Sequence, residues 1–369
     1  MESKRRFYFD YSLLFILIFL IFFGLVMLYS SSSYLSANKF GDSGYYLKLQ
    51  IRNLLIGLVA MAFLTFVDYR IWKRWGTVLY VLAMLLCLSV YIPGLGRASH
   101  GSARWLYLGP ISFQPSEVAK VASIFFLAMF IEHAPHAMYS VRNIFKVIIV
   151  MFPLVGVVAY MNLSTAIILF GICACMIFVA SPKYKPFGVL AISAIMVGAI
   201  FVSIAGYRMA RIQTWLHPEN ASGDDVYQTL QGLYAIGSGG LFGKGLGQSM
   251  QKLGNVPESQ NDFIFTIICE ELGLFGAICT ILLYALILWR MMVIANNAAD
   301  LYGSLLVVGI MAHLAIQVIL NIAVVTNSIP NTGITLPFIS YGGTSVSILM
   351  AEMGVVLGVS RQIRLDNIR

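Results

Sequence analysis

The run LLFILIFLIFFGLVML, residues 13–28, contains no charged side chain and follows the basic cluster Lys4-Arg5-Arg6. A helix of this length crosses the hydrocarbon of a bilayer at a rise of 1.5 Å per residue. The run is longer than the apolar part of a typical signal peptide, and many similar runs follow it. We therefore interpret it as an uncleaved first transmembrane helix near residues 11–31.

Similar apolar runs recur along the rest of the chain. Nine further candidate spans lie near residues 53–68, 76–93, 116–132, 145–161, 163–181, 186–207, 263–289, 304–326 and 341–360. Of the 369 residues, 59% are hydrophobic and 11% are charged, whereas soluble domains carry roughly a quarter charged residues. The sequence predicts an all-α polytopic membrane protein with about ten transmembrane helices, forming one domain over residues 1–369.

The positions of Lys and Arg predict the orientation of these helices. With the N-terminus in the cytoplasm, the cytoplasmic segments hold 14 Lys and Arg and the short external loops hold 5. Because short cytoplasmic loops are enriched in these residues, both termini should be cytoplasmic. A large extracellular loop, 208–261, then lies between helices 7 and 8, and 94–115 and 327–340 share its face. The net charge of +8 is scattered over the chain, so it does not indicate a nucleic-acid partner.

The glycine-rich segment 232–247, in the large external loop, contains seven glycines. Glycine permits close approach of the backbone to a phosphate, so a phosphate contact is one interpretation. A nucleotide-binding loop is excluded because Lys244 is followed by Gly245 rather than Ser or Thr. A flexible or re-entrant loop is the simpler interpretation.

Three acidic residues lie near the start of the span predicted at 263–289. Asp262 directly precedes its apolar run, where it could cap the helix or act chemically. Glu270 and Glu271 should lie about 12 Å deeper in the same span, by helical rise. Carboxylates at that depth are costly unless they are paired or face a wet cavity, so they either anchor neighbouring helices or serve function.

Polar side chains also cluster at the outer start of the span near 116–132. Glu117 and Lys120 are three residues apart and can form an ion pair on one helix face. Together with Arg104 and Gln114 they would suit a substrate that carries amides and a diphosphate. A purely structural ion pair remains the alternative.

Three sequence blocks resemble the SEDS family (shape, elongation, division and sporulation), which includes the RodA, FtsW and SpoVE types. The first block holds Gly101-Ser-Ala-Arg104-Trp105 and Phe113-Gln-Pro-Ser-Glu117-Val-Ala-Lys120. The second runs from Tyr227-Gln228 through the glycines to Asp262-Phe-Ile-Phe265 and Glu270-Glu-Leu-Gly273. The third is Thr332-Gly-Ile-Thr-Leu-Pro-Phe-Ile-Ser-Tyr-Gly-Gly-Thr344, which looks closer to division and sporulation members than to elongation members.

The resemblance implies a peptidoglycan glycosyltransferase that polymerises lipid II into β-1,4 glycan on the outer face of the bacterial cytoplasmic membrane. Its implied partners are a class B penicillin-binding protein and other divisome or elongation proteins. The family's essential carboxylate carries over to Asp262 as general base. Implied substrate-binding residues are Arg104, Gln114, Glu117, Lys120, Arg211, Gln228 and Ser340. A divalent cation, Mg or Mn, is expected, with Asp262 as a candidate ligand, and no organic cofactor.

Two other classes of function remain as alternatives. A lipid II flippase would also carry intramembrane carboxylates, but it needs polar groups through the full depth of the membrane. A non-catalytic scaffold of the cell-wall synthesis complex would leave Asp262 dispensable. One departure from the family's pattern concerns Asn162, which stands where relatives often have Asp and which cannot act as a base.

Overall fold

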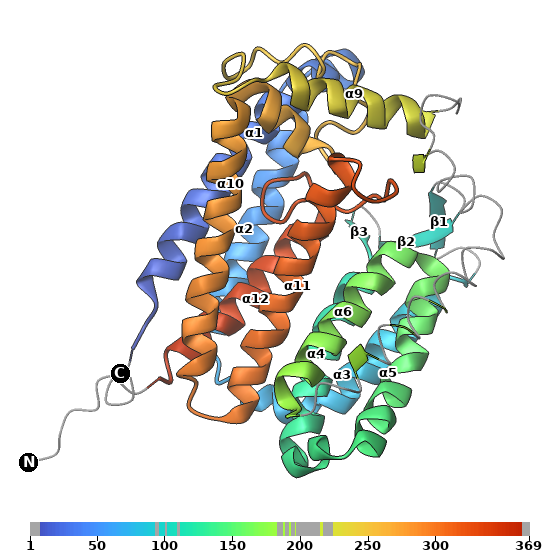
Figure 1. The fold of residues 1–369 in the computed structure, drawn as a ribbon, viewed down its shortest axis with the longest axis vertical. Helices are drawn as coiled ribbons and strands as arrows, with labels where there is room; N and C mark the ends of the chain where they lie inside the picture. Colours follow the sequence, from blue (N-terminus) through green and yellow to red (C-terminus); the bar gives the residue numbers. More distant parts are fainter. Residues whose placement is uncertain are drawn as a thin grey trace, which may run out of the picture.

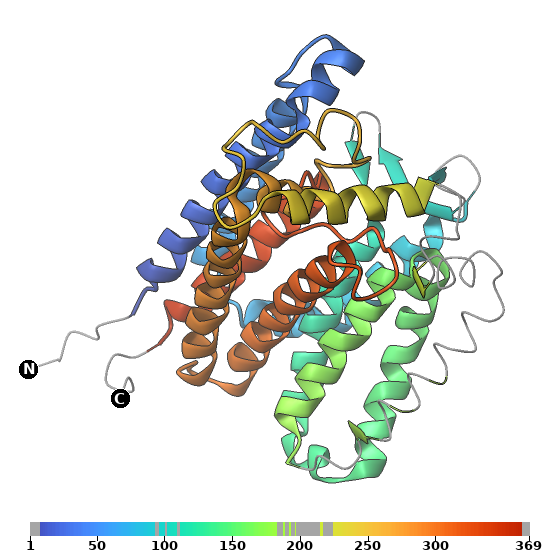
Figure 2. The same ribbon diagram turned by 45° about the horizontal axis from the view of Figure 1, so that its top comes forward.

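The computed structural model describes residues 8–92, 96–99, 102–108, 111–182, 187–188, 192, 196, 215–216 and 224–363 (Figure 1). Its longer helices run up and down in a bundle, except α9 (Asp224–Ser238), which lies across one end of it (Figures 1 and 2). They are α1 (Tyr11–Phe40), α2 (Tyr45–Phe66), α3 (Ile71–Ser89), α4 (Pro115–His133), α5 (Val141–Met161), α6 (Leu163–Ala180), α9 (Asp224–Ser238), α10 (Ile264–Asn296), α11 (Leu301–Val325) and α12 (Thr344–Ser360), with a 3-10 turn over Pro135–Tyr139.

Seven helices in the described part of the chain are long and apolar enough to cross a membrane: α1, α2, α3, α5, α6, α10 and α11. The protein is therefore a multi-pass, all-α membrane protein, as predicted. Two further predicted spans are helical but differ in character, because α4 carries Glu117, Lys120 and Glu132 and α12 has only 17 residues. The predicted span 186–207 lies mostly outside the described residues, so the number ten remains a prediction.

Close helix packing in the bundle depends on small residues. The centre is α11, which contacts α4, α6, α10 and α12. Gly354 and Gly358 lie one turn apart on α12 and face the backbone of α2. A side-chain carbon at Gly354 would lie 2.5 Å from the carbonyl oxygen of Met61. Since lipid tails are as apolar as the helices, such close backbone contact is a main source of helix association in membranes.

The first and last described residues lie side by side at one end of the bundle. The amide of Tyr8 donates to the carbonyl of Ile363 at 3.1 Å. Beside them, Arg290 near the end of α10 pairs with the buried Asp10 that caps α1, at 2.8 Å. Tyr8 and Ile363 therefore lie at the same end of the bundle. The long amphipathic helix α9 lies across the opposite end of the bundle (Figures 1 and 2).

A second ion pair at the end of the bundle that holds both termini joins α3 to α11. Arg70 contacts Asp300 at 2.7 Å, and the Tyr69 hydroxyl donates to the same carboxylate at 2.9 Å. Burial alone would raise the pKa of Asp300, but the amide of Gly303 with Arg70 and Tyr69 lowers it overall. Asp300 is thus both the N-cap of α11 and an inter-helix contact.

Residues 96–113 form a small sheet that the sequence interpretation treated only as a polar segment. Its antiparallel strands are β1 (Gly96–Ser99), β2 (Ser102–Leu108) and β3 (Ile111–Phe113), in the order β1-β2-β3. The sheet contacts α4 and α5 through β2. It adds a local hairpin structure to a bundle that is otherwise helical.

The helix α10 is broken near its start, at Gly273. Gly273 has φ 68° and ψ −165°, so a short helix, 264–272, ends there and a new one begins at Leu274. The loop after α9 lies against this break, where Leu274 donates to the carbonyl of Gly240 at 2.9 Å. Glu270 and Glu271 therefore lie in the short helix before the break and are fully buried, with the loop packed against them. The apolar side chains before them, Ile264, Phe265, Ile267 and Ile268, are buried within the protein.

Candidate active site

Asp262 lies in the turn that leads into α10 and is half-buried. The helix itself begins at Ile264 with Phe263 at the N-cap position and no side-chain cap. The interpretation of Asp262 as the N-cap is therefore wrong by one residue. A side-chain carbon at Gly333 would lie 3.5 Å from Oδ2 of Asp262, so the segment 332–344 borders the carboxylate.

The backbone of Asp262 is held by Asn321, a fully buried residue of α11 that sequence reasoning missed. The Asn321 amide donates to the carbonyl of Asp262 at 2.7 Å and to the carbonyl of Ile334 at 2.6 Å. It therefore ties the turn before α10 to the segment before α12. Hydrogen bonds that satisfy buried carbonyl groups in this way fix both segments in one geometry.

Two predicted substrate-binding residues also hold this turn. The hydroxyl of Ser340 donates to the carbonyl of Asn261 at 2.6 Å and accepts from the amide of Leu336 at 2.7 Å. The amide of Gln228, on α9, donates to the carbonyl of Pro257 at 3.0 Å. Both side chains are largely buried, with 3% of Ser340 and 9% of Gln228 exposed. In this structure they support the chain around Asp262.

Several oxygen acceptors near Asp262 are buried and receive no hydrogen bond from the described residues. They are Oε1 of Gln260, Oδ1 of Asn261, Oδ1 of Asn321 and Oγ1 of Thr332. The first two neighbour Asp262 in sequence, and the others belong to the segments that border it. Buried oxygens without donors are costly, and neutral oxygens with a carboxylate are ligands that Mg²⁺ and Mn²⁺ accept. Among the described residues, no group of three His, Cys, Asp or Glu could hold a metal.

A buried polar chain continues from this site into the bundle along one face of α11. His313, Gln317 and Asn321 are spaced four residues apart, and the Gln317 amide donates to the carbonyl of Thr335 at 3.0 Å. The side-chain oxygen of Gln317 lies 3.0 Å from Nε2 of His313. Because an amide oxygen can only accept, Nε2 carries the hydrogen in this contact. Nδ1 of His313 lies 2.9 Å from Glu352. This contact joins α11 to α12 inside the bundle.

The predicted pair Glu117–Lys120 is present and almost wholly buried. Its atoms are 2.8 Å apart, and the hydroxyl of Ser345, on α12, donates to the same carboxylate at 2.8 Å. Lys120 is 1% exposed, so the pair joins α4 to α12 within the bundle. Gln114 is the N-cap residue of α4 and is half-buried.

Two of the predicted cationic residues lie wholly or partly outside the described structure. The backbone of Arg104 belongs to β2, but its side chain lies outside the described part. Arg211 lies outside the described residues altogether. Their predicted contacts with substrate remain predictions.

Glu270 and Glu271 each receive a lysine from the loop after α9. Lys244 pairs with Glu270 at 2.7 Å, and Lys252 pairs with Glu271 at 2.8 Å. The hydroxyl of Ser30, on α1, donates to both oxygens of Glu271 at 2.7 and 2.8 Å. The sequence left open whether Glu270 and Glu271 anchor neighbouring segments or serve function. These contacts support the anchoring role.

The glycines of this loop serve its packing against α10. Gly243 has φ +77°, and a side-chain carbon there would lie 2.1 Å from the carbonyl oxygen of Glu271. The amides of Lys244 and Gly245 donate to the carbonyls of Glu270 and Glu271 at 3.0 and 2.9 Å. The glycine-rich segment therefore packs closely against the broken start of α10.

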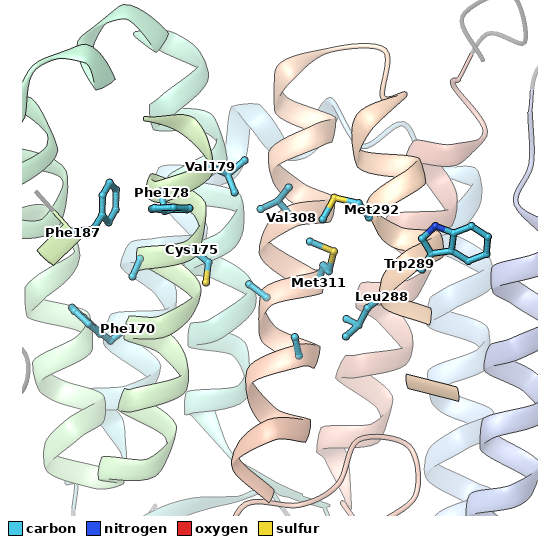
Figure 3. A pocket seen from close by; sticks show the side chains of 13 residues that line it. Phe170, Cys175, Phe178, Val179, Phe187, Leu288, Trp289, Met292, Val308 and Met311 are labelled. Carbon is cyan, nitrogen blue, oxygen red and sulfur yellow. The ribbon is translucent and has the colours of Figure 1, made fainter. Parts of the chain in front are cut away.

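A cavity of about 690 Å³ lies between α6 and the pair α10–α11 (Figure 3). Figure 3 shows apolar side chains lining it, among them Phe178, Trp289 and Met311. Val308, also on its wall, precedes Asn321 by 13 residues, about 20 Å of helix. The cavity is therefore remote from Asp262, and among the described residues that line it Cys175 alone has a titratable side chain.

Comparisons with known proteins agree with this arrangement. Residues 11–365 match the family model of FtsW, RodA and SpoVE, described as cell cycle protein. Stage V sporulation protein E of Bacillus subtilis is 42% identical over 363 residues, covering 96% of this chain and 98% of the relative. A probable peptidoglycan glycosyltransferase FtsW of a Geobacter species is 35% identical, covering 96% of this chain and 98% of the relative.

Solved structures share the fold over nearly the whole length. One chain is from a structure described as showing the coordination of polymerization and crosslinking by a peptidoglycan synthase complex. It matches with a TM-score of 0.79 and 26% identity, covering 97% of this chain and 99% of its own. A mutant of the rod shape determining protein RodA of Thermus thermophilus matches with a TM-score of 0.72 and 25% identity, covering 96% and 98%. This chain belongs to the FtsW, RodA and SpoVE family of cell cycle proteins.

Proposed function

We propose that this protein is a peptidoglycan glycosyltransferase that polymerises lipid II on the outer face of the bacterial cytoplasmic membrane. The observation that carries the proposal is the placement of Asp262, a half-buried carboxylate fixed through its backbone by Asn321 and bordered by Gly333. Relatives over the whole chain are named peptidoglycan glycosyltransferases. The 42% identity to a sporulation protein and the 35% identity to an FtsW favour a role in sporulation or division.

In the proposed reaction Asp262 acts as general base. It accepts a proton from the 4-hydroxyl of the acceptor sugar as that oxygen attacks the anomeric carbon of the donor. A new glycosidic bond forms with inversion, and the bond to the lipid diphosphate breaks and releases that group with its electron pair. The geometry required of Asp262 explains why three elements hold its turn: α9 through Gln228, α11 through Asn321, and the segment before α12 through Ser340.

A divalent cation would fit the oxygen-rich surroundings of Asp262. Candidate ligands are its carboxylate and the buried oxygens of Gln260, Asn321 and Thr332. When bound, such a cation would stabilise the negative charge of the leaving diphosphate. Binding of Mn²⁺ to the purified protein, followed by electron paramagnetic resonance, should weaken in Asp262→Asn and Thr332→Val. Unchanged binding in both variants would remove these ligands from the proposal.

A second protein is expected to act with this one. Because the structural relative with a TM-score of 0.79 is part of a peptidoglycan synthase complex that couples polymerization to crosslinking, we propose a class B penicillin-binding protein as partner. That partner would crosslink the glycan that this chain produces.

The polar chain in the bundle could instead indicate a flippase for lipid II. It ends at His313 and Glu352, however, and α11 contains only apolar residues and glycine between Ser304 and His313. Polar groups therefore occupy the half of α11 near Asp262 and do not follow that helix to its other end. This distribution favours chemistry at one surface over transport across the membrane.

The deciding experiment is reconstitution with lipid II, a divalent cation and the cognate penicillin-binding protein. Wild type should form glycan polymer, and Asp262→Asn should form none while remaining folded. Asp42→Asn is a matched control, since Asp42 is an exposed carboxylate paired with Lys48 on another loop. Polymer from Asp262→Asn would exclude the proposed base, and no polymer from wild type would favour a flippase or scaffold.

A further inference from the structure

The loop between α9 and α10 exposes large apolar side chains although it lies outside the spanning helices. They are Leu241, Phe242, Leu246, Met250 and Leu253. Phe242 is 81% exposed and Leu241 65%. Residues 241–253 contain no Asp or Glu, and their only charged residues are Lys244 and Lys252. We propose that this surface, the 241–253 loop, inserts into the interfacial region of the bilayer at the end of the protein that holds Asp262.

Two polar contacts between α1 and α10 mark the boundaries of the apolar slab. At one boundary Asp10 pairs with Arg290, and at the other Ser30 binds Glu271. Twenty residues separate Asp10 from Ser30, which is about 30 Å of helix. That length equals the thickness of the hydrocarbon core of a bilayer. Glu271 and its lysine therefore lie at a membrane boundary.

The start of the 241–253 loop lies at this same boundary and continues the lipid-facing side of α10. The amide of Phe275 donates to the carbonyl of Leu241 at 3.1 Å. Leu274 and Phe275, the first residues after the break in α10, are 52% and 65% exposed. Phe242 thus neighbours the apolar side chains that begin the spanning segment. This continuity argues for lipid as the occupant of the surface.

Both charged side chains and most backbone amides of the 241–253 loop are engaged within the protein. Both lysines are paired, with Glu270 and Glu271. The amides of Lys244 and Gly245 donate to carbonyls of α10. Irregular backbone is tolerated near lipid only when its polar groups are satisfied, and these contacts supply that condition. An apolar surface with its charges held inward is typical of interfacial membrane anchors.

Spin labels in lipid nanodiscs test the proposal directly. Phe242→Cys is labelled in a Cys175→Ala/Cys279→Ala background, since the other described cysteines are buried. Collisions with oxygen report lipid, and collisions with a water-soluble nickel chelate report water. Phe22→Cys on α1 is the lipid-facing control, and Asn255→Cys in an exposed part of the same inter-helix segment is the water-facing control. We expect the oxygen-to-nickel ratio at residue 242 to lie between those at 22 and 255 and to exceed that at 255 several-fold.

Equal accessibility of residues 242 and 255 to nickel would overturn the proposal. Protection of residue 242 that appears only when the penicillin-binding protein is added would also overturn it, because the surface would then bind protein. Correct behaviour of the labels at 22 and 255 shows that the Cys175→Ala/Cys279→Ala background is folded, and the same elution volume in gel filtration checks the Phe242→Cys variant. The measurement needs no glycosyl transfer, so its failure is distinct from failure of the proposed function.

Discussion

Replacing Lys252 with Met should destabilise the protein strongly, because it leaves the carboxylate of Glu271 buried without its cation. Glu271 is 0% exposed, and Lys252 contacts it at 2.8 Å while also donating to Ser30 at 3.0 Å. Removal of one partner from a buried ion pair costs about 3–5 kcal/mol. The hydroxyl of Ser30 still donates to both carboxylate oxygens, so the lower end of that range, roughly 3 kcal/mol, is expected.

The assay compares three variants by unfolding in mixed micelles: Lys252→Met, Glu271→Gln and the double variant. Glu271→Gln in the Lys252→Met background removes the unpaired charge and keeps a group that can bond to Ser30. The double variant should therefore recover most of the lost free energy of unfolding. The reasoning is refuted if Lys252→Met costs under about 1 kcal/mol, the value of an exposed pair, or if the double variant is no more stable.

Asn321→Ala should lower the turnover of lipid II while the protein stays folded, because the turn that carries Asp262 loses its amide donor. Asn321→Ser should recover part of the turnover. Equal turnover in wild type and both variants would contradict this role of Asn321. Gly243→Ala should reduce the midpoint of thermal unfolding, since the loop must then move away from α10. An unchanged midpoint would contradict the close packing of Gly243 against the carbonyl of Glu271. Asp300→Asn should cost less than about 1 kcal/mol at neutral pH, because Arg70 is half-exposed. Since the pKa of Asp300 is lowered on folding, the stability difference from wild type should shrink as the pH falls below about 4, and a difference that grows with acidity would contradict the assignment.

The apolar runs predicted the helices well because a bilayer requires about twenty apolar residues for each span. The break at Gly273 was not predictable from hydropathy. Residues 263–269 are as apolar as the span that follows, yet they are buried in protein under the loop that holds Gly243. Hydropathy measures the tendency of a side chain to leave water, and it does not distinguish lipid from a protein interior.

The candidate site was predictable only in part. Asp262 came from a motif, whereas its neighbours depend on contacts between residues distant in sequence, such as that with Asn321. One signal was present in the sequence: His313, Gln317 and Asn321 are polar residues four apart within an apolar span, so they share one helix face. The partners of Glu270 and Glu271 had no such signal, because irregular loops do not fix which lysine meets which carboxylate.

The two contacts between α1 and α10 also give the protein a fixed hydrophobic length. A single helix adapts to a thicker or thinner bilayer by tilting, but α1 and α10 are joined at both boundaries, by Asp10 with Arg290 and by Ser30 with Glu271. Tilting one against the other would break a buried ion pair or a buried hydrogen bond. The membrane must therefore adjust to the protein, so the lipids around it should take a local thickness near 30 Å, and membranes of other thickness should be less favourable surroundings for it.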